Sequence, residues 1–278
     1  MEDDRVTATS ETVERKKIKL NLSPTSLSMY YKSPLLFYLT YIAKVPDDTS
    51  VPVCYGLSGN VVHECLEQYA EHAISKDDVY EYFAKQWHVY HLDEHTDVNG
   101  NTLNQTDYLK AVIRGIEIID LYERHVCEEM FQFPLTESDE LAIGIKGIVD
   151  LQAHHKQTKH PVVIDYKTSN SVNAGKDFER QALFYNYLIH KQKGMLPAST
   201  LFHYLKLNVT KQYTFTHTDL QAFEEELHAI AEEIISYGTD IAKYPTGDID
   251  DLFNSKKQAC LQEVARRETL TLSVQQNI

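Results

Sequence analysis

The chain has 278 residues, of which 42% are hydrophobic and 24% are charged, and its formal net charge is −14. These values are those of an ordinary globular protein with one large or two small domains, and they exclude collagen-like and wholly disordered chains. No apolar run approaches the roughly 18 residues of a membrane span, and the charged N-terminus has no apolar signal segment. The four cysteines show no CxxC spacing, so we expect no disulfide framework and a cytoplasmic protein, located in the host cytoplasm if it is viral.

The first half of the chain is predicted to be mostly helical. Residues 1–18 are polar and charged and are predicted to form a flexible tail. Ser23 and Pro24 predict a helix start, because serine caps helices and proline fits the first helical position. This helix is expected to break at Ser33-Pro34 and to resume to residue 42. Apolar residues at helical spacing then predict helices over about 59–74, 77–92 and 106–131, the last with a core stripe of Ile113, Ile116, Ile119 and Val126.

From residue 134 the pattern becomes typical of strands. Segments rich in Val and Ile predict strands over 134–138, 141–153, 161–167, 199–206 and 209–216. Helices are predicted over 176–193 and over the amphipathic segment that ends at Gly238. This order indicates an α/β protein with one mixed sheet flanked by helices.

Two aspartates lie in strand sequences, Asp150 in GIVDLQ and Asp165 in VVIDYKTS. A carboxylate buried among apolar residues costs several kcal/mol unless it is paired or binds a metal. If the two strands pair as a hairpin, both carboxylates can converge on one ion. Lys167 lies two residues after Asp165 and therefore on the same strand face. Carboxylates that bind Mg²⁺ or Mn²⁺ beside a lysine suit phosphodiester hydrolysis, whereas the alternative for this Asp-x-Lys alone is a simple ion pair.

Two helical pairs accompany the aspartates. His63 and Glu67 are four residues apart in GNVVHECLEQ, and Gln181 and Tyr185 are four apart in ERQALFYNYL. A spacing of four puts both members of each pair on one helix face. Taken alone, each pair is more typical of ordinary core or surface residues than of a site.

In chain order, the motifs GxxxHxxxE, GxxD, VIDYKT and QxxxY resemble those of RecB-type nucleases of the PD-(D/E)xK superfamily. The opening segment LSPTSLSMYYKSPLLFYLTYI also resembles the first segment of that family, and the likeness covers about residues 20–245. It implies a restriction-endonuclease-like core and a metal-dependent DNA nuclease, which we expect to be an exonuclease in replication, recombination or repair. It further implies one nuclease domain over 19–245, with a helical part to about 132 and a catalytic core over 133–245, followed by an extension over 246–278.

The resemblance also implies roles for individual residues. Lys167 would be the catalytic lysine, and Glu67 would lie behind His63. Gln181 and Tyr185 would line the active site and contact the nucleic-acid backbone. The ligands of Mg²⁺ or Mn²⁺ would be His63, Asp150, Asp165 and the main-chain carbonyl of Tyr166.

The sequence departs from the family pattern in two places. Val149 stands where the name-giving motif has proline. Some relatives carry an iron–sulfur cluster bound by one cysteine in the opening segment and three near the C-terminus. Here Ser33 occupies the first position and Cys260 is the one C-terminal cysteine, so we expect no iron–sulfur cluster.

The charge is unevenly distributed. Residues 146–211 contain ten lysines or arginines and four acids, a net charge of +6, which leaves −20 for the rest of the chain. Local charge directs the docking of a polyanion, so we expect DNA to bind this segment, with Lys176 and Arg180 among its contacts. The alternative is a solvated basic face. The tyrosines of the opening helix could stack bases or simply pack in the core.

Two other functions stay open. One is a catalytically weak nucleic-acid-binding or scaffolding subunit of a helicase–nuclease complex, and the other is a metal-dependent RNase. The chain has no GxxxxGK[ST] motif and therefore no helicase motor of its own, so a helicase or recombination protein is a candidate partner. We expect the substrate to be single- or double-stranded DNA with a free end, and no membrane association. The oligomeric state does not follow from the sequence.

Overall fold

A six-stranded mixed sheet forms the centre of the protein. The computed structural model describes residues 17–48, 53–172, 175–250 and 254–276. Its strands are β1 (Ile18–Leu22), β2 (Tyr122–Glu137), β3 (Leu141–His155), β4 (Pro161–Lys167), β5 (Ser199–Tyr204) and β6 (Val209–Tyr213). Their order is β1-β3-β4-β5-β6, and β2 pairs with β3 along its other edge. The pairs β1–β3 and β4–β5 are parallel and the others are antiparallel.

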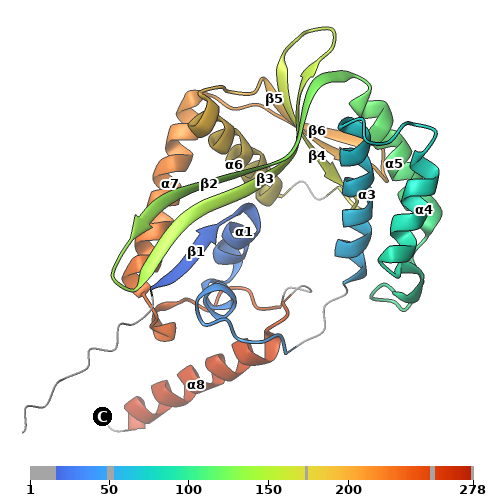
Figure 1. Ribbon diagram of the computed structural model, residues 1–278. Helices are drawn as coiled ribbons and strands as arrows, with labels where there is room; N and C mark the ends of the chain where they lie inside the picture. The colour runs from blue at the N-terminus through green and yellow to red at the C-terminus, as the bar shows by residue number, and fades with distance from the viewer. Residues whose placement is uncertain (1–16, 49–52, 173–174, 251–253, 277–278) are drawn as a thin grey trace, which may run out of the picture.

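Helices cover both faces of the sheet. They are α1 (Pro24–Lys32), α2 (Pro34–Phe37), α3 (Cys54–Ala70), α4 (Val79–Val89), α5 (Gln105–Ile119), α6 (Lys176–Lys193), α7 (His217–Tyr237) and α8 (Lys257–Gln276), with a π-helical turn at Tyr38–Ile42 and short 3₁₀ turns at Leu92–Glu94 and Ile241–Lys243. Helices α3, α4 and α5 form one group at one end of the sheet, and α6 and α7 form a second group (Figure 1). The mixed α/β fold predicted from the sequence is confirmed.

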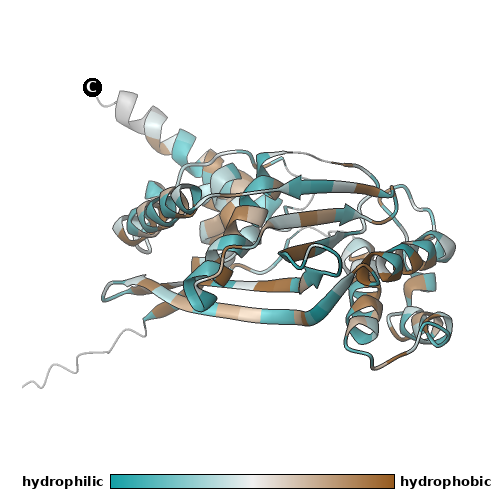
Figure 2. Cartoon of the chain, turned by 90° about the horizontal axis from the view of Figure 1, so that it is seen from above, coloured by the Kyte–Doolittle hydropathy of each residue, from teal (hydrophilic) through white to brown (hydrophobic). Residues whose placement is uncertain are grey.

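The core consists mainly of two clusters, one for each helix group. On β4, Val163 packs with the α6–α7 group, whereas Val162 and Ile164 pack with the α3–α5 group. Successive strand residues point to opposite faces, so a strand covered on both sides reads as a continuous apolar run. Hydrophobic segments alternate with hydrophilic ones along the outer helices (Figure 2).

The predicted helix boundaries in the opening segment are confirmed. Ser23 caps α1, because its hydroxyl accepts a hydrogen bond from the amide of Ser26 at 3.2 Å, and Pro24 is the first helical residue. Ser33 ends α1 and caps α2 by accepting a hydrogen bond from the amide of Leu36 at 3.1 Å. At the other end of the chain, Gly238 follows α7 with a φ of 58°, which glycine adopts without strain.

The predicted helix over 106–131 is wrong beyond residue 119. Helix α5 ends there and β2 runs from Tyr122 along almost the whole length of β3. Two members of the supposed core stripe, Ile113 and Val126, are 44% and 43% exposed. Pairing with β3 therefore overrides the local helical pattern, as tertiary contacts commonly do.

The strand β1 was missed altogether. Its sequence IKLNL pairs in parallel with Leu141–Ile145, more than 100 residues away along the chain. Ile18 therefore belongs to the sheet rather than to the predicted tail, and the rest of that tail up to residue 16 lies outside the described residues. Because of β1 and β2, the part of the chain expected to be helical contains two strands. Helix α3 also begins at Cys54, five residues before its predicted start.

The C-terminal helix α8 packs against the opening segment. Cys260 forms a small apolar cluster with Leu35, Leu36 and Leu39. The carboxylate of Asp48 accepts hydrogen bonds from the first-turn amides of Gln258 and Ala259 at 3.0 and 2.7 Å, which satisfies donors that a helix start leaves unpaired. Within the described ranges, none of the helices combines the length and apolar character that a membrane crossing requires.

Candidate active site

The two predicted aspartates lie opposite each other where β3 and β4 separate. The last pair of the antiparallel ladder is Leu151 with Ile164, so the next residues in register are Asp150 and Asp165. Beyond this pair the carboxylate of Asp150 replaces a strand partner, because its Oδ2 accepts a hydrogen bond from the amide of Tyr166 at 2.9 Å. The hairpin assumed from the sequence therefore does bring the two carboxylates together.

Lys167 and Asp165 form the second part of the site. Lys167 Nζ lies 2.8 Å from Asp165 Oδ2 and donates a hydrogen bond to Gln181 Oε1 at 2.9 Å. The ammonium group also lies about 5 Å from the ring centres of Phe178 and Phe202. The Lys167 side chain is 17% exposed, so it is held by its partners and still reaches the surface of the site.

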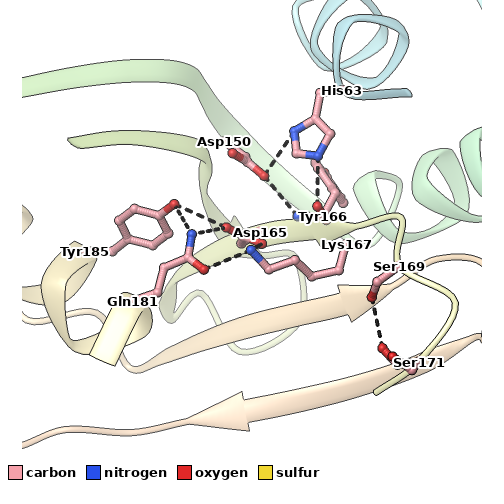
Figure 3. Close-up of polar contacts among 9 residues, drawn as sticks. All are labelled: His63, Asp150, Asp165, Tyr166, Lys167, Ser169, Ser171, Gln181 and Tyr185. Carbon is pink, nitrogen blue, oxygen red and sulfur yellow. Dashed lines mark hydrogen bonds and ion pairs between the residues drawn. The ribbon is translucent and has the colours of Figure 1, made fainter. Parts of the chain in front are cut away.

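Helix α6 orients this pair through its Gln-x-x-x-Tyr motif (Figure 3). Gln181 Nε2 donates to the hydroxyl of Tyr185 at 2.7 Å and to Asp165 Oδ1 at 3.3 Å, and the Tyr185 hydroxyl donates to the same oxygen at 3.2 Å. Burial raises the pKa of Tyr185 well above its usual value, which keeps its hydroxyl protonated as a donor. Gln181 and Tyr185 therefore fix Asp165 directly, and Gln181 also fixes Lys167.

His63 reaches the same point from α3. Its Nε2 lies 2.8 Å from the main-chain carbonyl oxygen of Tyr166, and its Nδ1 lies 3.3 Å from Asp150 Oδ2. The structure thus gathers the predicted ligands His63, Asp150 and the Tyr166 carbonyl. Helix α3 packs closely against α5 at Gly115. A Cβ added to Gly115 would lie 2.5 Å from a methyl carbon of Leu66 on α3, so this position has no room for a side chain.

Glu67, predicted to support His63, lies one helical turn further along α3 and is half-buried. Burial raises its pKa, and the neighbouring carboxylates of Glu71 and Glu64 raise it further. Its neighbourhood is therefore acidic, which favours a cation near this end of the site.

Sequence reasoning missed Glu128, because residue 128 was assigned to a helix. Glu128 lies on β2, and it forms with His63 and Asp150 a group whose ligand atoms all lie within 4.8 Å of one another. Burial, followed by the charge of Asp150, raises the pKa of Glu128 to about 7. Burial also raises the pKa of Asp150 to about 6. A strand assignment for the segment VCEEM, paired with GIVDL, would have placed this glutamate at the site.

The donor set suits a divalent cation. Asp165 is 2% exposed, and its Oδ2 accepts no hydrogen bond from the described residues, although Lys167 lies beside it. Carboxylate oxygens and a carbonyl with one imidazole are ligands for Mg²⁺ or Mn²⁺. The residues present therefore fit the metal that the sequence predicts.

Fewer lysines of the basic segment over residues 146–211 are available to bind DNA than its net charge suggests. Several of its lysines pair with acids outside the segment: Lys159 with Glu123, Lys191 with Glu224 and Lys193 with Glu129. Lys176 is exposed at the first residue of α6. The guanidinium of Arg180 lies 3.9 Å from the centre of the Tyr31 ring, a cation–π contact.

The tyrosines of the opening segment mainly pack. Tyr30 is 5% exposed and donates a hydrogen bond to Glu233 at 2.7 Å, and Tyr31 donates to Glu226. Tyr38 donates to the carbonyl of Thr239 at 2.9 Å. These hydroxyls tie the opening segment to α7 and to the turn after it, which favours the packing role over base stacking.

The sequence of this chain is similar to that of a known nuclease superfamily. The family model described as the PD-(D/E)XK nuclease superfamily matches residues 21–248. No curated protein matches the chain at a significant level. Of the solved structures, a candidate exonuclease from Eubacterium rectale aligns with 9% identity and a TM-score of 0.48, covering 88% of this chain and 90% of that one. The protein SSO0001 aligns with 14% identity and a TM-score of 0.33, covering 65% of this chain and 86% of that one.

Proposed function

The chain belongs to the PD-(D/E)XK nuclease superfamily, and from that premise we propose that it is a RecB-type exonuclease that hydrolyses phosphodiester bonds in DNA. The superfamily and the core fold expected from the motifs are confirmed, and the RecB-type assignment belongs to this proposal. We assign the enzyme to DNA replication, recombination or repair, either alone or beside a helicase or recombination protein. The observation that carries the proposal is the convergence of Asp150, Asp165, His63 and Lys167 where β3 and β4 separate.

Each residue of the site has a chemical task in this proposal. Nucleases of this superfamily use divalent metals, and here Asp150, Asp165, His63 and the carbonyl of Tyr166 would hold Mg²⁺ or Mn²⁺. Such a cation polarises a phosphate and lowers the pKa of water, so that a nucleophile is available near neutral pH. The Lys167 ammonium stabilises the negative charge that develops on the phosphate oxygens.

The test is a digestion assay on linear and circular DNA, each single- and double-stranded, and on RNA. We expect degradation of linear DNA with Mn²⁺ or Mg²⁺, survival of circular DNA, and complete loss of cleavage in EDTA. Full cleavage in EDTA would refute the metal mechanism. Cleavage of RNA alone would support the RNase alternative, and binding without cleavage would support the scaffolding alternative.

A groove beside the site offers a path for the substrate. It has a volume of about 460 Å³ and lies between α1 and the start of α6, lined by Thr25, Ser28, Gly175, Phe178 and Gln181 among others. Gln181 lines the groove and also accepts the hydrogen bond of Lys167, so the groove adjoins the proposed catalytic lysine. The start of α6 has no side-chain cap, but Asp177 and Glu179 occupy its first turn. Asp177 also lines the groove, where it pairs with Lys32.

The DNA path is tested by reversing Lys176 and Arg180 to glutamate in a chain that also carries Asp165→Asn, so that binding is measured without cleavage. Each phosphate contact releases counterions. We therefore expect weaker DNA binding and a salt dependence that is flatter by up to about 2 in log–log slope. The matched control reverses Lys85 and Lys110, which are exposed on α4 and α5. Equal affinity and slope in the two double variants would show that Lys176 and Arg180 do not contact the DNA.

A further inference from the structure

We propose that Glu128 is an additional ligand of the divalent cation, which it would bind together with His63 and Asp150 on the β2 side of the site. This inference rests on the proposed function, since it concerns the same metal centre. It extends the ligand set that the sequence motifs imply by a residue on a strand that carries none of those motifs.

The register of β2 against β3 places Glu128 next to the candidate site. Cys127 pairs with Leu151 and Glu129 pairs with Val149, so Glu128 lies opposite Asp150 in the β2–β3 ladder. Residues directly opposite in an antiparallel pair bring their side chains together. The backbone of Glu128 has a φ of 46°, a left-handed conformation that is unfavourable for a residue with a side chain. Such backbone strain in a strand is typical of positions that serve a site.

The partners of the two neighbouring glutamates differ. Glu129 forms an ion pair with Lys193 and accepts a hydrogen bond from Gln152. For Glu128, the described residues provide no lysine or arginine partner, and its carboxylate faces the carboxylate of Asp150 and the ring of His63. Two half-buried carboxylates so close together repel each other when both are ionised, and protonation of one of them or a cation between them removes the repulsion.

The dimensions fit a single ion. The three donor atoms lie within 4.8 Å of one another, and ligand atoms on opposite sides of Mg²⁺ or Mn²⁺ are separated by roughly 4 Å. A small inward movement would therefore close the group around the ion. A third carboxylate lies close to this group, because Asp165 is opposite Asp150 on the other edge of β3. Its Oδ2 already has the Lys167 ammonium as an ionic partner at 2.8 Å, whereas within the described ranges Glu128 and Asp150 share no lysine between them.

The experiment measures Mn²⁺ binding to the full chain by isothermal titration calorimetry, without nucleic acid. The variants are Glu128→Gln, Asp150→Asn as a reference ligand change, and Glu71→Gln as a charge control. Glu71 is an exposed acid whose charge acts on the Glu67 and Cys127 side chains next to the site. We expect Glu128→Gln to weaken Mn²⁺ binding by about tenfold or more, as expected for loss of a ligand. We expect Glu71→Gln to change it by less than twofold.

Thermal unfolding in EDTA checks that Glu128→Gln folds, and we expect its melting temperature to equal or exceed that of the wild type because a repulsive charge is removed. Mn²⁺ affinity within twofold of the wild type in Glu128→Gln, with clear loss in Asp150→Asn, would overturn the Glu128 proposal and leave the nuclease proposal intact. No Mn²⁺ binding to the wild type would overturn both.

Discussion

Asp165→Asn is expected to lower the cleavage of linear DNA by at least about a hundredfold, a loss comparable to removing a key transition-state stabiliser. Asp165 is almost completely buried and joins the predicted metal ligands to Lys167, Gln181 and Tyr185. The substitution therefore removes a charged ligand and the ionic partner of the lysine together. Initial rates with Mn²⁺, compared with those of Asp107→Asn on the exposed face of α5, measure the effect.

We expect Asp165→Asn to be at least as stable as the wild type when no metal is bound. The Asp165 charge contributes to the raised pKa of Asp150. A carboxylate whose pKa is raised on folding lowers stability as the pH rises from its ordinary value of 3.8 to about 6, and the full penalty is present above that. Removing the Asp165 charge relieves this repulsion above about pH 6. In EDTA at pH 8 the melting temperature should stay the same or rise. Near-wild-type cleavage, or a collapse of the fold without metal, would contradict the role assigned to Asp165.

Lys167→Met is expected to cause a loss of cleavage of similar size, on the order of a hundredfold or more, with Mn²⁺ binding retained. Methionine keeps the apolar stem between Phe178 and Phe202 but removes the ammonium group. The predicted metal ligands lose a nearby positive charge, so Mn²⁺ affinity should be equal or higher. Calorimetry with Mn²⁺ and a cleavage assay, both with Lys110→Met as control, separate the two effects. Weaker metal binding in Lys167→Met would mean that the lysine organises the ligands rather than the phosphate.

Sequence reasoning predicted which residues come together in most of the candidate site, because the patterns that identify them lie within short segments of the chain. Asp150 and Asp165 belong to consecutive strands joined by a short turn, so their pairing follows from neighbouring segments. The four-residue spacing in α6 places Gln181 and Tyr185 on one face whatever the rest of the fold does. These residues meet as expected, although their roles in catalysis stay predictions.

Other parts of the molecule depend on contacts that no local pattern reveals. The strand β1 is stabilised by pairing with residues of β3 that lie more than 100 positions later in the chain. The strand β2 is stabilised by pairing with β3 along almost its whole length. Glu128 was not predicted to lie at the site because its segment was predicted to be helical. Only the strand β2 places it opposite Asp150. Arg180 likewise rests on the ring of Tyr31, a contact between two helices that composition and charge do not indicate.

The packing of α3 against α5 makes the position of the His63 imidazole depend on Gly115, a buried residue of α5. Gly115 leaves room for Leu66, and a methyl group there would have to push this fully buried leucine aside. His63 lies less than one turn before Leu66 on the same rigid helix, so a shift of the helix axis moves the ring relative to the Tyr166 carbonyl and Asp150. The position of His63 therefore depends on how closely α3 and α5 approach each other. A substitution that crowds this helix crossing would displace the proposed ligand His63 although all the proposed ligand residues are unchanged.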